Sequence, residues 1–193
     1  MINERNLIVV SGPSGCGKDT VVKELMKLCN KVKLSVSCTT RKPRGNEIDK
    51  ESYYFLTREE FKARIDSKRM LEYTEYAGNL YGTPMDELEE KMVGDSVVVL
   101  IIEVKGAKNV KTAYPDSMCA FIVPPSIEAL EERLRKRCTE DEENIKRRLE
   151  IAREELKELD YYDIAIENLD ADVCAKKLLS AIESWRSRPQ NIK

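Results

Sequence analysis

Short apolar runs alternate along the chain with longer stretches in which apolar residues recur at helical spacing. Four runs have the length and composition of buried strands: residues 7–10, 96–102, 117–123 and 164–166. Helical spacing is found in five stretches: residues 21–30, 106–114, 126–137, 141–160 and 170–186. Strands that alternate with helices in this way predict an α/β fold, in which helices cover both faces of a parallel sheet.

Residues 33–93 depart from this rhythm. A second strand is predicted at 33–37, and the polar, basic stretch 38–46 is broken by proline and glycine and predicts a loop. Shorter elements follow: a strand at 53–56, a helix to Ser67 opened by a capping box of Thr57 and Glu60, a strand at 71–76, a turn at Gly78–Asn79, and a helix to Val93 with Thr83 as N-cap and Pro84 as its first residue. The short, turn-linked strands between 38 and 84 predict an inserted antiparallel lobe.

The segment between the first strand and the first helix carries the pattern G-x-x-x-x-G-K in the residues Gly12, Pro13, Ser14, Gly15, Cys16, Gly17, Lys18, Asp19 and Thr20. Strand, glycine-rich turn, lysine and helix in this order indicate a phosphate-binding loop. The glycines let backbone N–H groups converge on one anion, the helix start adds further N–H groups, and the lysine reaches the outer phosphates. The alternative interpretation is an ordinary glycine-rich turn with a surface lysine. A dinucleotide-binding turn would need glycine in place of Thr20.

The residue after the lysine differs from the usual pattern. Ser or Thr commonly stands there and binds Mg²⁺ through its hydroxyl, whereas here Asp19 follows Lys18 and the hydroxyl comes one position later, at Thr20. A carboxylate in the first turn suits the helix dipole but repels a nearby phosphate. Either a metal ion lies between Asp19 and the phosphate or the side chain points away, and the sequence leaves both alternatives open.

Composition and charge narrow the class of protein. The chain has 193 residues, 35% of them charged, and a net charge of −2, so we expect one domain with a salt-bridged surface and no nucleic-acid partner. The longest apolar run, residues 97–102, is far shorter than the roughly 18 residues of a membrane span, and the amino terminus has no apolar signal core. We therefore expect a cytoplasmic protein that binds no membrane.

Two residue types bear on the chemistry. The six cysteines form no C-x-x-C pair and are expected to be reduced thiols: Cys16, Cys29, Cys38, Cys119, Cys138 and Cys174. Histidine is absent, which excludes Ser–His and Cys–His catalysis and histidine zinc sites. Phosphoryl transfer is least affected, because it depends on positioning and charge stabilisation more than on proton transfer.

With these motifs in view, the chain resembles the guanylate kinase family over nearly its whole length. Several separated stretches carry the resemblance: residues 11–15 with Gly17 and Lys18, residues 35–44, Tyr53 with Phe55, Glu72, residues 78–83, Gly106, residues 124–126, and Arg133, Arg137 and Arg148. The resemblance implies one domain made of a five-stranded parallel core (residues 1–37, 85–125 and 151–193), a GMP-binding lobe (38–84) and a lid that closes over ATP (126–150).

The resemblance also implies roles for individual residues. ATP would be held by residues 12–20 and Arg133, and the phosphate of GMP by Arg41, Arg44, Tyr53 and Tyr81. The implied catalytic residues are Lys18, Arg41, Arg137 and Arg148, and the implied contacts of Mg²⁺ are Asp19 and Thr20. Arginine suits phosphate because its guanidinium is planar, bidentate and permanently charged. Taken alone, the basic loop is interpreted equally well as solvated surface. The tyrosines taken singly are more often lobe core than ligands, and each lid arginine alone is more readily interpreted as a surface residue.

Guanine is implied to be read by Glu72 together with the hydroxyls of Ser37 and Thr83. A carboxylate accepts hydrogen bonds from guanine N1–H and from the 2-amino group. Adenine offers a bare acceptor at N1 and no amino group at C2, a mismatch that costs on the order of 1–3 kcal/mol. Taken alone, Glu72 is more readily interpreted as a surface carboxylate. The neighbouring arginines and hydroxyls favour base recognition.

Two positions depart from the family pattern. The family commonly ends its central strand with an acid-x-acid pattern, but here Ile101 takes the first position and only Glu103 remains, which would orient the waters of Mg²⁺ or contact GMP. One hypothesis is that Asp19 supplies the charge that is missing at Ile101. The Asn-Asp pair that follows the last strand in the family is altered here to Glu167–Asn168.

The predicted activity is reversible transfer of the γ-phosphoryl group of ATP to GMP, giving ADP and GDP, with Mg²⁺ as cofactor. No general base is needed, because the acceptor phosphate is already an oxyanion. Two rival functions remain. A related module that binds a phosphorylated peptide would usually have a degraded phosphate loop, and a kinase of a phosphorylated sugar would not need Glu72 with Thr83. The oligomeric state is left open by the sequence.

Overall fold

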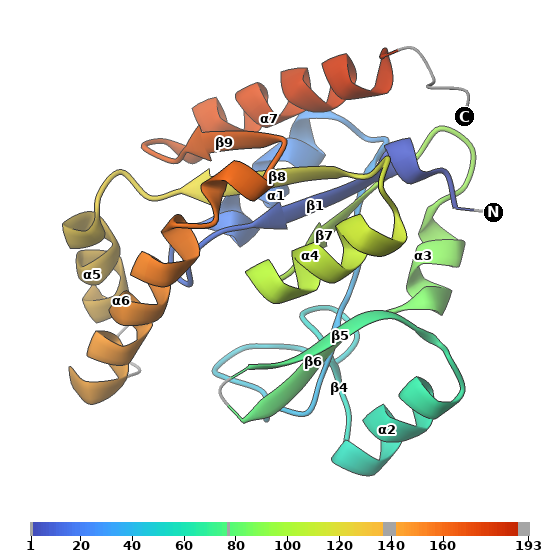
Figure 1. The fold of residues 1–193 in the computed structure, drawn as a ribbon, viewed down its shortest axis with the longest axis horizontal. Coiled ribbons are helices and arrows are strands. Elements are labelled where there is room, and N and C mark those ends of the chain that lie inside the picture. The colour runs from blue at the N-terminus through green and yellow to red at the C-terminus, as the bar shows by residue number, and fades with distance from the viewer. Residues whose placement is uncertain (1, 77, 137–141, 189–193) are drawn as a thin grey trace.

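The computed structural model describes residues 2–76, 78–136 and 142–188. Its larger sheet has five strands in the order β2-β7-β1-β8-β9, and every neighbouring pair is parallel (Figure 1). The strands span these residues: β1 Leu7–Ser11, β2 Val32–Leu34, β7 Val97–Ile101, β8 Met118–Val123 and β9 Ile164–Glu167. The predicted parallel core sheet is therefore confirmed.

Helices cover both faces of this sheet, with α7 above it and α4 below it in Figure 1. The covering helices span these residues: α1 Lys18–Leu28 and α7 Ala171–Arg186 on one face, and α3 Met85–Lys91 and α4 Val104–Ala113 on the other. Two short 3₁₀ helices complete the core: η1 Glu4–Asn6 and η2 Leu159–Tyr161.

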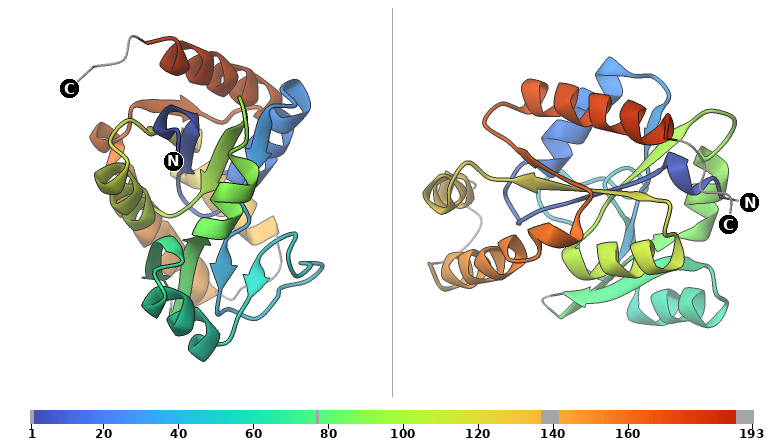
Figure 2. Two further views of the ribbon diagram at one scale, coloured as in Figure 1. Left: turned by 90° about the vertical axis from the view of Figure 1, so that its right-hand side faces the viewer. Right: turned by 45° about the horizontal axis from the view of Figure 1, so that its top comes forward.

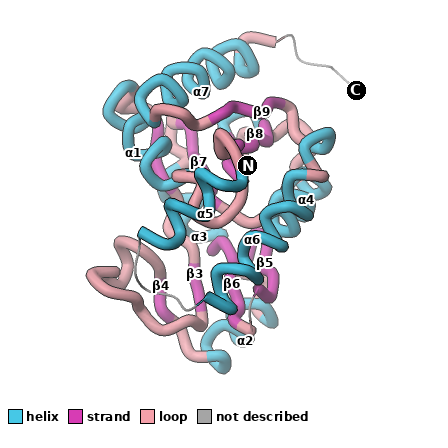
Figure 3. The backbone as a smooth tube through the Cα atoms, turned by 90° about the vertical axis from the view of Figure 1, so that its left-hand side faces the viewer, coloured by secondary structure: helices cyan, strands magenta, loops and turns pink. Residues whose placement is uncertain are grey.

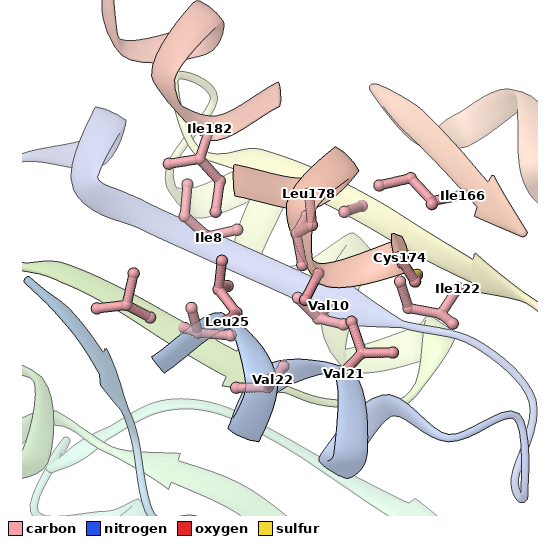
Figure 4. Packing of buried hydrophobic residues seen from close by; sticks show 14 of the residues in the cluster. Ile8, Val10, Val21, Val22, Leu25, Ile122, Ile166, Cys174, Leu178 and Ile182 are labelled. Atoms are coloured by element: carbon pink, nitrogen blue, oxygen red, sulfur yellow. The ribbon is translucent and has the colours of Figure 1, made fainter. Parts of the chain in front are cut away.

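The central strand β1 is buried along its whole length. Ile8 and Val10 point to the layer of α1 and α7, where they pack with residues such as Leu178 (Figure 4). Leu7 and Val9 belong to the apolar cluster on the opposite face. Because both faces are covered, the first four residues of the strand form an unbroken apolar run in the sequence instead of an alternating pattern. Its carboxyl end delivers the chain to the glycine-rich loop.

A smaller sheet lies beside the core, in the lower part of Figure 3, and has the strand order β4-β3-β6-β5. Its elements span these residues: β3 Cys38–Thr39, β4 Tyr54–Phe55, α2 Arg58–Asp66, β5 Met70–Tyr76 and β6 Asn79–Pro84. The pairs β5–β6 and β3–β6 are antiparallel, whereas β3 and β4 run parallel. The capping box predicted for α2 is confirmed, since Thr57 and Glu60 bond each other's backbone N–H.

Several predicted boundaries in this region are wrong. The strand predicted at 33–37 ends at Leu34, and Cys38–Thr39, predicted as loop, forms β3. Thr83 is no N-cap: it lies in β6, a strand that the sequence analysis missed, and Pro84 occupies the N-cap position of α3. The Thr83-Pro84 pair resembles a helix start locally, but pairing with β5 keeps this segment extended.

Helices α5 (Ile127–Lys136) and α6 (Glu142–Leu156) lie together beyond the carboxyl end of β8 (Figure 2, right). Their facing apolar residues form a separate small core: Leu130, Leu134, Ile145, Leu149 and Ala152. α6 ends at Leu156 instead of near residue 160, because backbone bonds from Lys157 to Glu154 and from Glu158 to Glu155 tighten its end. The predicted helix ends at Arg137 and Asp141 lie outside the described residues.

No helix in the described part of the chain is long and apolar enough to cross a membrane.

Candidate functional site

The glycine-rich loop joins β1 to α1 at the carboxyl edge of the core sheet. Gly12, Gly15 and Gly17 all have positive φ, at 146°, 93° and 96°. A Cβ on Gly12 would lie 2.3 Å from the carbonyl oxygen of Ile122 in β8, so the loop lies directly against the neighbouring strand. Only glycine combines this backbone conformation with this close approach, because it has no Cβ.

Lys18 opens α1 and folds back over this loop. Its Nζ donates to the carbonyl oxygens of Gly12 at 2.6 Å and Pro13 at 3.3 Å, and the residue is buried. Burial opposes the charge on Lys18, but the Cys16 thiol and the carboxylates of Glu103, Asp19 and Glu155 favour it and hold its pKa above the usual value. The ammonium group of Lys18 is therefore charged at neutral pH and lies against the loop.

The buried side-chain amide of Asn168 also holds the loop in place, a role that the sequence did not predict. Asn168, directly after β9, donates through Nδ2 to the carbonyl oxygen of Cys16 at 2.8 Å. A Cβ on Gly17 would lie 2.6 Å from this same Nδ2. In the sequence, this position was noted only because the Glu167–Asn168 pair differs from the family pattern, and that difference did not predict a role for Asn168. In the structure Asn168 supports the phosphate loop.

Two of the three arginines attributed to the lid contact the phosphate loop. Arg133 of α5 donates to the carbonyl oxygens of Cys16 at 3.2 Å and Asn168 at 3.0 Å. Arg148 of α6 donates to the Ser14 hydroxyl at 2.6 Å. Arg137 lies outside the described residues. The structure thus brings guanidinium groups from two separate helices to the segment that would bind the phosphates.

A second carboxyl group accompanies Glu103 beside Lys18. Glu155 lies on α6, and burial together with the nearby charge of Glu103 raises its pKa to about 8. The Oε2 atom of Glu103 is buried and has no hydrogen-bond partner among the described residues. Glu155 was missed because a charged, helical sequence gives no sign of which glutamate will be buried. The site therefore holds two acidic groups and one ammonium group close together.

A recess of about 340 Å³, including the space open to solvent, lies between the two sheets, and its lining includes Glu103, whose charge acts on Lys18. Its lining comes from both sheets: Ser37, Tyr53, Glu72, Thr74, Tyr81, Gly82, Ile101, Ile102 and Glu103. Five of the eight residues attributed to GMP binding are among them, which are Ser37, Tyr53, Glu72, Tyr81 and Glu103. Widely separated parts of the sequence thus meet in one pocket.

Glu72 of β5 is the buried acid of this recess, with 5% of its surface exposed. The Thr83 hydroxyl donates to its Oε1 at 2.9 Å from the facing position on β6. Burial raises the pKa of Glu72 to about 7, against the lowering effect of the bonds from Thr83. A Cβ on Gly106 of α4 would lie 2.8 Å from Oε2, so only glycine leaves room for the carboxylate there.

Arg41 is held by an acid that the sequence analysis did not single out. Its Nη1 and Nη2 each donate to Glu47 at 2.9 Å, and its guanidinium lies 5.4 Å from the centre of the Tyr53 ring. Only 9% of the Arg41 side chain is exposed, so it is not part of a solvated basic surface. Glu47 also accepts a bond from the backbone N–H of Arg44 at 2.7 Å. Glu47 therefore connects the side chain of Arg41 to the backbone of Arg44.

The other predicted contacts are divided between the recess and exposed segments of the chain. Tyr53 and Tyr81 meet edge to face with ring centres 6.2 Å apart, and Arg44 is exposed. Asp19 and Thr20 are exposed in the first turn of α1. Among residues 2–76, 78–136 and 142–188 there is no group of three or more His, Cys, Asp or Glu side chains that could hold a metal ion.

A parallel sheet with a phosphate loop after its central strand, an inserted second sheet and a recess between the two define a P-loop nucleotide-binding protein. The Guanylate kinase family model matches residues 4–185. The chain belongs to the guanylate kinase family.

Individual relatives agree with this assignment. The chain is 46% identical to the guanylate kinase of Prochlorococcus marinus subsp. pastoris over 184 residues, which cover 95% of this chain and 100% of the relative. It is 46% identical to that of Synechocystis sp. over 176 residues, which cover 91% and 92%. Among solved structures, guanylate kinase from Anaplasma phagocytophilum has a TM-score of 0.76 at 29% identity, covering 94% of this chain and 86% of the other.

Proposed function

We infer that this protein transfers the γ-phosphoryl group of ATP reversibly to GMP, giving ADP and GDP. The observation that carries the choice of acceptor is the buried carboxylate of Glu72 in the recess beside the phosphate loop. Family membership supports ATP and GMP as the two substrates.

Glu72 is suited to guanine for a chemical reason. Guanine presents two adjacent donors, N1–H and the 2-amino group, which match the two oxygens of an ionised carboxylate. Thr83 fixes the orientation of Glu72 through Oε1, and Ser37 adds a hydroxyl to the same recess. An adenine base would leave the buried charge without donors, and such a group is costly to desolvate.

We propose that Arg41, Arg44, Tyr53 and Tyr81 hold the phosphate of GMP. Three of the five N–H groups of Arg41 are used in bonds to Glu47 and the carbonyl oxygen of Lys42. The Nε–H and the second N–H of Nη2 make none of these three bonds, and a phosphate matches the geometry of that edge. Tyr81, whose hydroxyl also contacts Arg41, and Tyr53 supply hydroxyls near this edge.

Phosphoryl transfer would then need positioning and charge more than proton transfer. Lys18 and the loop N–H groups are proposed to bind the outer phosphates of ATP. Arg133 and Arg148, which already contact the loop, would stabilise the charge that develops on the transferred group. Arg137 is proposed for the same task. We further propose that the lobe of residues 38–84 and the lid of residues 126–150 close over the substrates and exclude water.

Mg²⁺ fits this site as an ion carried mainly by the phosphates of ATP. The donors that suit Mg²⁺ here are oxygens, namely the Thr20 hydroxyl and the carboxylates of Asp19 and Glu103, and Mg²⁺ commonly takes one or two such groups together with phosphates and water. When bound, the ion neutralises charge on the phosphates. We propose Thr20 and Asp19 as its contacts, and a cytoplasmic location for the protein.

The test is formation of ADP from ATP and Mg²⁺ with GMP, AMP, CMP, UMP or a phosphorylated sugar as acceptor. Turnover with GMP is expected in the wild type. It should be lost in Lys18→Ala and weakened in Glu72→Gln, and the matched control Glu75→Gln, an exposed glutamate on the same strand, should behave like the wild type. GMP binding without turnover would instead indicate a binding module, and turnover only with a phosphorylated sugar would indicate the other kinase.

A further inference from the structure

The chain crosses between the two sheets at two places. It leaves the core through residues 35–37, between β2 and β3, and it returns at the Pro84–Met85 junction, where β6 ends and α3 begins. Glu87 lies in the first turn of α3, directly after the return crossing. Its side chain reaches the outgoing crossing, so one carboxylate joins both connections of the smaller sheet.

The carboxylate of Glu87 is buried, with 4% of the residue exposed. Its Oε1 accepts a bond from the backbone N–H of Val36 at 3.3 Å and contacts the ammonium group of Lys91. Its Oε2 accepts a bond from the hydroxyl of Tyr54 in β4 at 2.9 Å. Lys91 in turn donates to the carbonyl oxygen of Leu34, the last residue of β2, at 2.7 Å.

Two of the three residues that bond Glu87, Val36 and Tyr54, are next to residues that line the recess. Val36 precedes Ser37, and Tyr54 follows Tyr53, and both Ser37 and Tyr53 belong to the lining. Neighbouring residues of a strand point to opposite faces, so Tyr54 can reach Glu87 while Tyr53 faces the recess. The backbone N–H of Tyr54 also donates to the carbonyl oxygen of Ser37 at 2.9 Å, which connects the two positions directly.

The charge state of this group agrees with its contacts. Burial favours the neutral form of Glu87, but the bonds from Lys91, Tyr54 and Val36 outweigh it and hold the pKa of Glu87 below its usual value. The carboxylate is therefore ionised at neutral pH. Because Val36 follows β2, Tyr54 lies in β4 and Glu87 lies in α3, the loss of one bond would loosen the relation between these segments and not only one side chain.

We propose that Glu87 is a positioning residue for the acceptor site, which holds Ser37 and Tyr53 at their places in the recess through Val36 and Tyr54. This inference rests on the proposed function. Glu87 itself lines no part of the recess, so it acts through its neighbours and does not touch GMP.

The experiment compares steady-state constants of the full chain in four forms: wild type, Glu87→Gln, Tyr54→Phe and the double variant. We expect the KM for GMP to rise about three- to tenfold in each single variant, while the KM for ATP and kcat change less than about twofold. The KM for GMP of the double variant should be no higher than that of the more impaired single variant, because both changes affect the same bond between Tyr54 and Glu87. The exposed Glu89→Gln on the same helix is the matched control.

Two results would overturn the inference: an unchanged KM for GMP in folded variants, or equal rises in the KM values for GMP and ATP, which mark a general structural defect. If Glu87→Gln does not fold, Tyr54→Phe decides alone, since it removes one oxygen from a half-buried ring. Failure of the wild type to phosphorylate GMP would instead contradict the proposed function, and the two failures are thereby distinguished.

Discussion

The hydroxyl of Thr83 donates a hydrogen bond to the carboxylate of Glu72 at 2.9 Å, across facing positions of β5 and β6. This bond satisfies one oxygen of a side chain that is almost completely buried. Burial nevertheless raises the pKa of Glu72 to about 7. A ligand with two donors would favour the ionised form of this carboxyl group and lower its pKa.

The first prediction concerns the pH dependence of GMP binding. If only ionised Glu72 accepts the donors of guanine, the dissociation constant of GMP should rise as pH falls through about 7, by roughly tenfold between pH 8 and pH 6. Titration calorimetry without ATP measures this constant directly. The phosphate of GMP also titrates near pH 6, so the same series with Glu72→Gln isolates the contribution of Glu72. A pH dependence that is identical in Glu72→Gln would contradict the prediction.

The second prediction concerns the stability of the empty protein. The pKa of Glu72 is about 7 in the folded chain against 4.5 for an ordinary glutamate, so between these values the folded chain keeps a proton that the unfolded chain releases. The stability contributed by this carboxyl group is therefore present below pH 4.5 and is lost as pH rises to about 7. Glu72→Gln should raise the free energy of unfolding at pH 8 by about 1–3 kcal/mol in urea denaturation. An equal gain at pH 4 would contradict this explanation.

The third prediction uses Gly106 of α4. Alanine is a better helix former by about 1 kcal/mol, so Gly106→Ala should not lower the thermal midpoint. Its Cβ would, however, lie 2.8 Å from Oε2 of Glu72 and displace the carboxylate. We expect the KM for GMP to rise at least about fivefold while the KM for ATP stays the same. An unchanged KM for GMP would mean that Glu72 moves aside without consequence and does not read the base.

The fourth prediction concerns Glu47, which holds the guanidinium group of Arg41 through two bonds. Glu47→Gln keeps the size of the side chain but removes one acceptor oxygen and the charge. We expect the KM for GMP to rise about three- to tenfold, because Arg41 would lose its fixed orientation toward the phosphate. Glu51→Gln, an exposed glutamate in the same segment, is the control. If Glu47→Gln lowered the KM for GMP, Glu47 would be a competitor of the phosphate and not its support.

The fifth prediction concerns Lys18, the charged group at the mouth of the loop. Lys18→Met should reduce kcat by about a thousandfold or more, because the buried cation that stabilises the charge on the transferred phosphoryl group is lost. Lys23→Met, an exposed lysine on the same helix, should keep full activity. Circular dichroism should show a folded protein in both cases. A folded Lys18→Met variant with wild-type turnover would remove the loop lysine from the mechanism.

The core of the fold could be predicted from the sequence, because buried parallel strands and amphipathic helices leave strong local patterns. The run of β1 and the capping box of α2 are examples. The smaller sheet was harder. β3 has two residues, and β6 contains Gly82 and Pro84, so neither carries a strand pattern of its own. Pairing with β5 decides that β6 is extended, and such long-range pairing is not visible in a local window.

The site likewise contains some residues that a local pattern predicts and others that it does not. The phosphate loop is a contiguous motif whose chemistry follows from its residues. Supporting groups such as Glu47, Glu155 and Asn168 were missed, because their roles depend on burial and on partners that only the folded chain brings close to them. Glu47 is six residues from Arg41, and in the sequence it is one of many charges in a polar stretch. Only the folded chain distinguishes these acids from the exposed ones around them.

The most direct test of the account is the ratio of kcat/KM for GMP to kcat/KM for AMP, measured in the wild type and in Glu72→Gln. We expect a wild-type ratio of at least about a thousand, since a site built for guanine donors leaves its buried carboxylate unpaired with adenine. In Glu72→Gln the ratio should fall at least about tenfold, mainly through a loss of activity with GMP. A ratio that is unchanged by this substitution, or a wild type that does not prefer GMP, would contradict the assignment of Glu72 as the reader of the base.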